Sequence, residues 1–133
     1  MKYLLFTFIT ITIFMCLGVS CHRDNEPRYF KFKNNSNTAI YYGLSYSYPD
    51  TDVNKIEDKP YSGKIASKVN PVDSKFITTA PLSVRPTMQL FIFNSNVIEN
   101  IPWDSIVKHY MVLKRYQFTV SDMEKGNWTI TYP

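Results

Sequence analysis

The chain has 133 residues, with 15 basic and 11 acidic side chains and a formal net charge of +4. This length is enough for one domain and short for two. The basic residues are scattered without any block of five or six like charges, so nucleic acid is not an expected partner.

The first segment resembles a bacterial export signal. Residues 1–3 form a short basic head, and residues 4–19 form an apolar run. A basic head, an apolar segment and a small-residue junction are typical of a secretory signal peptide. The run ends in Gly18-Val19-Ser20-Cys21, which resembles the junction cut by lipoprotein signal peptidase. This resemblance implies that Cys21 becomes the diacylated first residue of the mature chain and that a lipid bilayer is its first partner.

Two other interpretations of the junction stay open. Gly18-Val19-Ser20 also fits the small-x-small rule of ordinary signal peptidase, which would release a soluble secreted protein. Alternatively the run stays as a membrane anchor, although residues 4–19 fall short of the roughly 20 apolar residues of a spanning helix. The cysteine count favours the lipoprotein, because cleavage removes Cys16 and leaves Cys21 as a single unpaired thiol. Acylation uses that thiol, and two acyl chains hold a protein firmly because each buried methylene contributes about 0.8 kcal/mol.

The expected organisation has three parts. Residues 1–20 are the signal peptide, residues 21–28 are a lipidated linker, and residues 29–133 are a single β-rich domain. We expect anchorage to the cell envelope, at the outer membrane, on a side of that membrane that the sequence leaves open.

The domain is expected to begin with two paired strands. Residues 29–33 alternate phenylalanines on one face with lysines on the other, and residues 38–48 alternate as well. Asn34-Asn35-Ser36-Asn37 lies between them and has the residues of a turn, so the segment predicts a β-hairpin. Residues 64–67 and 74–79 are two further expected short strands.

The most apolar segment follows. Residues 87–94 predict a central strand that is buried on both faces. The hydrophobic period then changes, and Pro102 suits the first turn of a helix. One face of this expected helix carries Trp103, Ile106, Val107 and Tyr110. Residues 111–120 return to strand character.

The C-terminal segment predicts a short helix and a last strand. Ser121-Asp122-Met123-Glu124 has the pattern of a capping box, and Gly126 is expected to end that helix in the left-handed conformation. Residues 128–132 alternate apolar and threonine side chains. The expected fold class is therefore mostly β: an antiparallel β-sandwich of about six or seven strands, with one or two short helices near the C-terminus.

Parts of this sequence resemble a group of small Bacteroidetes lipoproteins. The matching residues near the C-terminus are Leu113-Lys114-Arg115-Tyr116, then Thr119, Asp122 and Asn127-Trp128-Thr129-Ile130-Thr131-Tyr132-Pro133. Tyr48-Pro49-Asp50-Thr51 and Trp103 with Ile106 match the same pattern. The resemblance implies a location at the envelope and no particular chemistry.

The residues of catalytic and metal sites are sparse. Nucleophilic catalysis needs a base near the nucleophile, and His109 lies off the apolar stripe of its helix, where a surface position is expected. Asp50-Thr51-Asp52-Val53-Asn54 resembles the start of a calcium loop. Lys55 and Tyr61 stand where the glycine and the bidentate glutamate of such a loop are needed. We therefore expect no enzyme, no metal site and no cofactor.

The expected activity is binding, either to an envelope protein or to a glycan. A glycan-binding lipoprotein is the more specific alternative, because tyrosine rings offer flat apolar faces with hydroxyl groups to a sugar. The candidate residues are Tyr41, Tyr46, Tyr48 and Tyr61. The competing interpretation places the Ile40 to Tyr48 face in the core, and the exposure of the four rings distinguishes the two.

Overall fold

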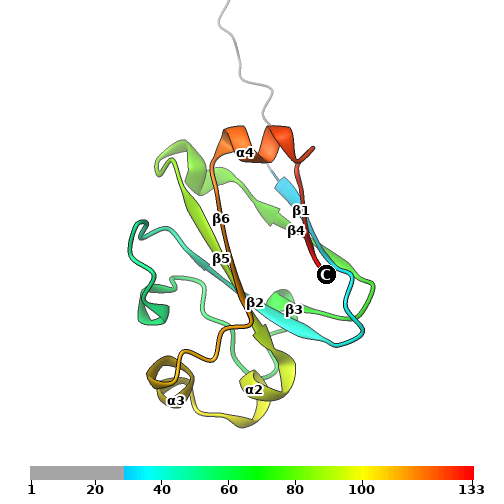
Figure 1. The fold of residues 1–133 in the computed structure, drawn as a ribbon, viewed down its shortest axis with the longest axis vertical. Helices are drawn as coiled ribbons and strands as arrows, with labels where there is room; N and C mark the ends of the chain where they lie inside the picture. The colour runs from blue at the N-terminus through cyan, green and yellow to red at the C-terminus, as the bar shows by residue number, and fades with distance from the viewer. Residues whose placement is uncertain (1–28) are drawn as a thin grey trace, which may run out of the picture.

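The computed structural model describes residues 29–133, which form two β-sheets packed face to face (Figure 1). The smaller sheet has the strand order β4-β1-β7 and the larger has the order β3-β2-β5-β6. Every pair is antiparallel except β1 with β7, which is parallel. The expected mostly antiparallel sandwich is therefore confirmed. The segment expected to be a signal peptide and Cys21 lie outside the described residues.

The strands are short. The smaller sheet contains β1 (Tyr29–Asn34), β4 (Ser74–Thr78) and β7 (Thr129–Tyr132). The larger sheet contains β2 (Ile40–Ser45), β3 (Lys68–Val69), β5 (Met88–Asn94) and β6 (Lys114–Phe118). The strands expected over residues 74–79, 87–94, 111–120 and 128–132 are thus present as β4, β5, β6 and β7.

Three α-helices and three single-turn 3-10 helices connect the strands. The α-helices are α2 (Ser95–Asn100), α3 (Trp103–Lys108) and α4 (Val120–Lys125). The 3-10 helices are η1 (Val53–Lys55), η2 (Ile65–Ser67) and η3 (Ala80–Ser83). Among residues 29–133, no helix has the length and apolar character needed to cross a membrane.

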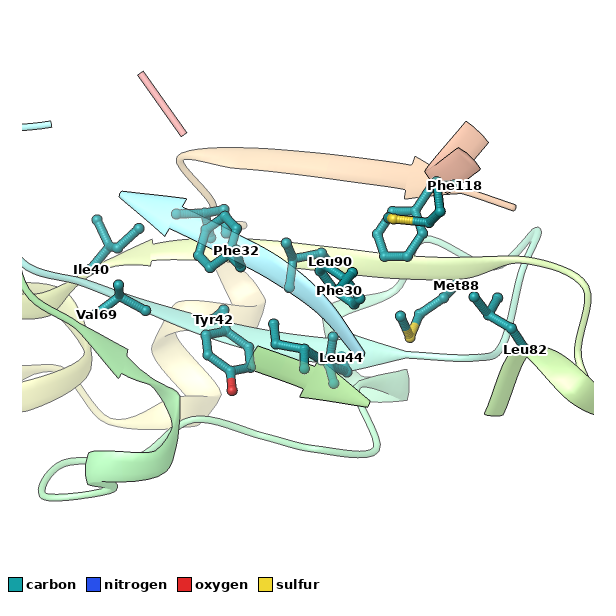
Figure 2. Packing of buried hydrophobic residues seen from close by; sticks show 13 residues of the cluster. Phe30, Phe32, Ile40, Tyr42, Leu44, Val69, Leu82, Met88, Leu90 and Phe118 are labelled. Atoms are coloured by element: carbon teal, nitrogen blue, oxygen red, sulfur yellow. The ribbon is translucent and has the colours of Figure 1, made fainter. Parts of the chain in front are cut away.

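Strand β5 is buried on both faces, as its sequence predicts. Leu90 points into the core between the sheets, where it meets Phe30 and Phe32 of β1 (Figure 2). Ile92 belongs to the same cluster. Phe91 and Phe93 point the other way, into a second cluster with residues of η1, α2 and α3. The larger sheet is therefore covered on its outer face, and the smaller sheet contributes no residue to that covering cluster.

The predicted hairpin of residues 29–48 is wrong. β1 and β2 lie in different sheets, and the segment between them crosses from one sheet to the other. The side chain of Asn34 is buried at this crossing and donates to the carbonyl oxygens of Thr38, Val69 and Asn70 at 2.8, 3.2 and 3.1 Å. Its Oδ1 accepts from the Ser36 N–H at 3.0 Å. These bonds hold an arch between two sheets, which uses the same turn residues as a hairpin.

The helix boundaries also differ from the prediction. Helix α4 begins two residues earlier than expected, with a capping box made by Thr119 and Asp122 instead of Ser121 and Glu124. Gly126 has a φ of −82°, and the left-handed residues are instead Asn127 and Trp128.

Two segments before β6 take an unexpected form as well. Asn94, expected to end a strand, also caps α2 by accepting from the Asn96 N–H. The strand expected over residues 64–67 forms η2, and only Lys68–Val69 beyond it pairs as β3.

Candidate functional site

The four candidate tyrosines do not share one environment. Tyr41 is only 1% exposed, and its hydroxyl donates to Glu99 at 3.1 Å, so its ring is unavailable to a sugar. Tyr46 is half-buried against the core, with the Arg85 guanidinium 5.9 Å from its ring centre. Tyr48 and Tyr61 are exposed, at 47% and 62%.

The two exposed tyrosines lie toward opposite ends of β2. Leu44 and Asp58 form an antiparallel bridge, so the chain runs in opposite directions toward Tyr48 and toward Tyr61. Beyond Tyr48, the carbonyl oxygen of Asp50 accepts from Gln89, which pairs with the last residue of β2. Beyond Tyr61, the carbonyl oxygen of Ala66 accepts from the hydroxyl of Tyr42, near the first residue of β2. Tyr48 and Tyr61 therefore do not form one continuous platform.

Glu57 joins three segments at the Tyr46 end of β2. Its carboxylate accepts from the Tyr46 N–H at 3.0 Å, from the Ser47 hydroxyl at 3.0 Å and from Arg85 at 3.1 Å. Burial alone would raise the pKa of Glu57, but these hydrogen bonds outweigh it and hold the pKa below its usual range. Both carboxylate oxygens are engaged, so Glu57 acts as a clamp between loops.

Glu99 makes a similar clamp at the other end of β2. Its Oε1 accepts from the Lys68 ammonium at 2.6 Å and from the Tyr41 hydroxyl, which connects α2 to β3 and β2. The hydrogen bond from Lys68 is the main cause that lowers the pKa of Glu99, and the same bond raises the pKa of Lys68. Burial is the main cause that raises the pKa of Tyr41.

A third polar group lies on the covered face of the larger sheet. Gln89 is buried, donates to the Asp50 carbonyl oxygen at 2.7 Å and accepts from Arg115 at 2.6 Å. Each polar end of its amide therefore has a partner, and the residue fixes the loop that carries Asp50 onto the sheet. Like the other two groups, it performs a structural role.

The segment that resembles a calcium loop is a pair of turns. Asp50 Oδ1 accepts from the Asp52 N–H, and Asp52 Oδ1 accepts from the Asn54 N–H, both at 2.9 Å. Across residues 29–133, no three His, Cys, Asp or Glu side chains come together as a metal site. His109 is exposed just after α3, as its position in the helical pattern predicts.

The outer face of the smaller sheet carries alternate side chains of β1, β4 and β7. Lys31 and Lys33 lie on its central strand, β1, and neither has an ion-pair partner among the described residues. Across β1, the register places Phe76 beside Lys31 and Ser74 beside Lys33. We call this surface the lysine–aromatic face. It consists of Tyr29, Lys31, Lys33, Ser74, Phe76, Thr78, Thr129 and Thr131.

Two aromatic rings on the lysine–aromatic face are mostly exposed. Phe76 is 71% exposed and Tyr29 is 56% exposed, while the neighbouring Phe30 and Ile77 point inward and are buried. The eight residues of the face include two lysines and no acidic side chain. Alternation within β1 predicts the outward lysines. The positions of Phe76 and the threonines beside these lysines depend on the register between strands that are distant in sequence, which alternation within β1 does not predict.

Comparison with protein-family models, with curated proteins and with solved structures finds no match for this chain.

Proposed function

We propose that this protein is a lipid-anchored, non-enzymatic binding domain of the cell envelope. The observation that carries the proposal is the junction Gly18-Val19-Ser20-Cys21, which follows an apolar run and stands shortly before the first strand at Tyr29. A cysteine at that position can be acylated. It cannot form an internal disulfide in the exported domain, because cleavage leaves no second cysteine.

The polar clusters of the domain support a binding role. The carboxylates of Glu57 and Glu99 and the amide of Gln89 are each engaged by hydrogen bonds that join loops, helices and strands. General acid–base catalysis needs a side chain that is free to exchange a proton with a substrate. These three groups instead fix the loops on the larger sheet, which leaves the outer face of the smaller sheet as the broad surface for contact.

Mass spectrometry of the N-terminus tests the proposal. The full chain is expressed in a bacterial host, and the protein of the membrane fraction is compared between wild type and Cys21→Ala. We expect a diacylated Cys21 at the N-terminus of the wild-type protein and loss of the membrane-bound form in the variant. A matched Cys16→Ala variant should behave like wild type, because cleavage removes that residue.

The same measurement separates the alternatives. A bare Cys21 on protein in the soluble fraction would support the secreted interpretation, and a retained apolar run would support the membrane anchor. The glycan-binding alternative has the exposed rings of Tyr48 and Tyr61, but these lie toward opposite ends of β2.

A further inference from the structure

We infer that the lysine–aromatic face rests on the anionic lipid surface to which Cys21 tethers the domain. This inference depends on the proposed lipid anchor and goes further, because it names the surface that meets the membrane and the lipid charge that it prefers. Three observations carry it: the length of the tether, the charge of the face and the exposure of its aromatic rings.

The tether keeps the lysine–aromatic face close to the bilayer. Residues 22–28 separate Cys21 from Tyr29, and a chain of this length spans at most about 30 Å when it is fully extended. Tyr29 is itself part of the face and begins its central strand. From Tyr29 to Lys33 the strand covers only about 13 Å. The tether is therefore short enough for every residue of the face to reach the lipid surface.

The charge of the lysine–aromatic face suits anionic lipid. Lys31 is flanked by Phe76 and Thr129, and Lys33 by Ser74 and Thr131, so no neighbouring strand position offers a counter-charge. A basic side chain near an anionic bilayer strengthens binding about fivefold, and two such side chains strengthen it about 30-fold. For a domain that is already tethered, this preference decides which side faces the membrane.

The aromatic rings supply the apolar part of the contact. Phe76 lies directly across from Lys31, and Tyr29 lies two residues before Lys31 on β1. Tyrosine and phenylalanine partition into the interfacial region of a bilayer, where their rings are apolar while the adjacent lysines stay in water. This arrangement matches the surface of a bilayer more closely than a concave ligand site, because it is spread over three strands of one sheet.

A spin-label experiment on the intact, acylated protein tests the inference. The processed chain has no free thiol once Cys21 is acylated, so Thr131→Cys introduces a single site for a nitroxide on the lysine–aromatic face. Val84→Cys is the control, because Val84 is 83% exposed and precedes Arg85, which pairs with Glu57 away from this face. Each protein is reconstituted into vesicles of phosphatidylcholine alone or with 30% phosphatidylglycerol. Collision of the label with an aqueous nickel complex is then measured.

We expect the label at position 131 to lose contact with the nickel complex in vesicles that contain phosphatidylglycerol, while the label at position 84 stays accessible. A Lys31→Glu/Lys33→Glu variant should restore access at position 131 by shifting the ratio of docked to free domain at least about 30-fold. Lys55→Glu/Lys108→Glu is the matched control. It makes the same change in net charge at exposed lysines of η1 and α3, and it should leave position 131 protected.

Other results would overturn the inference. Equal access at position 131 in both vesicles, on protein whose acylation is confirmed by mass, contradicts membrane docking and leaves the lipid anchor standing. Protection that is independent of lipid charge and rises with protein density shows that a second copy of the chain covers the face instead. If mass spectrometry finds no acyl groups on the chain, the proposed function itself is contradicted. This measurement is made before any label is attached.

Discussion

At the scale of single residues, Val72 has the least favourable backbone conformation in the turn between β3 and β4. The Asp73 N–H donates to the Asn70 carbonyl oxygen at 3.2 Å, and Val72 between them has a φ of +59°. This is the third position of a type II turn, where glycine or asparagine is favoured. A β-branched residue in this conformation costs on the order of 1–2 kcal/mol.

Val72→Gly should therefore stabilise the protein by about 1 kcal/mol and raise the melting temperature by about 5 °C. Thermal unfolding followed by circular dichroism measures the shift. Val84→Gly is the control, because Val84 is also an exposed valine but has a φ of −111°. That variant should lose up to about 1 kcal/mol through added freedom of the unfolded chain. Equal changes in the two variants would contradict the account of strain at Val72.

Tyr42 makes the stability of the protein sensitive to alkaline pH. Burial, followed by the charges of Asp58 and Tyr46, raises the pKa of Tyr42 to about 12, and its hydroxyl donates to the Ala66 carbonyl oxygen at 3.1 Å. The unfolded chain loses the tyrosine proton near pH 10, whereas the folded chain keeps it until about pH 12. Stability is therefore fully present below pH 10 and falls as the pH rises through this interval.

By pH 11 this linkage should cost wild type about 1 kcal/mol relative to pH 8.5. Urea unfolding at the two pH values measures the loss of unfolding free energy. The Tyr42→Phe variant should lose about 1 kcal/mol less than wild type, because phenylalanine has no proton to release. Identical losses in the two proteins would show that Tyr42 does not carry the effect.

At the scale of elements, Asn34 holds the arch that connects β1 and β2, which belong to different sheets. Its amide donates to three carbonyl oxygens of the arch and of the β3 end. Asn34→Ala should cost about 3 kcal/mol, because it removes three hydrogen bonds of a buried side chain, including the one to the buried Val69 carbonyl oxygen. Urea unfolding measures the loss. Ser36→Ala removes a partly exposed member of the same network and should cost about 1 kcal/mol or less. An equally small loss for both variants would contradict the role of Asn34.

Helix α4 offers a test of its observed boundary. The Thr119 hydroxyl accepts from the Asp122 N–H, and the Asp122 carboxylate accepts from the Thr119 N–H at 2.9 Å. This backbone hydrogen bond is the main cause that lowers the pKa of Asp122. Thr119→Ala should cost about 1 kcal/mol in urea unfolding, and Ser121→Ala less than about 0.5 kcal/mol. The reverse order would restore the boundary that the sequence predicts.

The elements that the sequence predicts well are those whose pattern is local. Residues 87–94 are mostly apolar, so β5 lies where it is expected. Residues 103–110 have a clear helical period, and α3 begins at Trp103 as expected but ends at Lys108, while Tyr110 beyond it has a φ of +47°. The capping residues of α4 are ambiguous because Thr119 and Ser121 both precede an acidic residue by three positions. The connection between β1 and β2 is equally ambiguous, because the turn residues Asn34-Asn35-Ser36-Asn37 suit a hairpin as well as an arch.

At the scale of the whole molecule, β7 completes the smaller sheet by pairing with β1 in parallel. Ile130 lies beside Phe32, and the Trp128 carbonyl oxygen accepts from the Lys31 N–H at 2.8 Å. No local pattern predicts this pairing, because it joins strands from the two ends of the domain. The same limit applies to the lysine–aromatic face, where alternation predicts the lysines and only the register adds Phe76 and Thr131.

A chain that ends at Asn127 should therefore fail to fold cooperatively, because one side of β1 loses its partner and the core between the sheets is opened. Thermal unfolding and near-UV circular dichroism detect the loss. Removal of Pro133 alone should leave the melting temperature unchanged, since this exposed residue lies outside β7. A cooperative transition at the wild-type temperature in the shortened chain would contradict the importance of the parallel pair.

The central position of β1 has a mechanical consequence. In the proposed lipid-anchored form, flow or a bound partner that drags on the domain would transmit its force to β1 at Tyr29. Because β1 is bonded to β4 on one side and to β7 on the other, a pull along the strand shears both ladders at once instead of unzipping either from its end. Many hydrogen bonds then bear the force together. The rate of forced unfolding, on which mechanical stability depends, is therefore expected to be low.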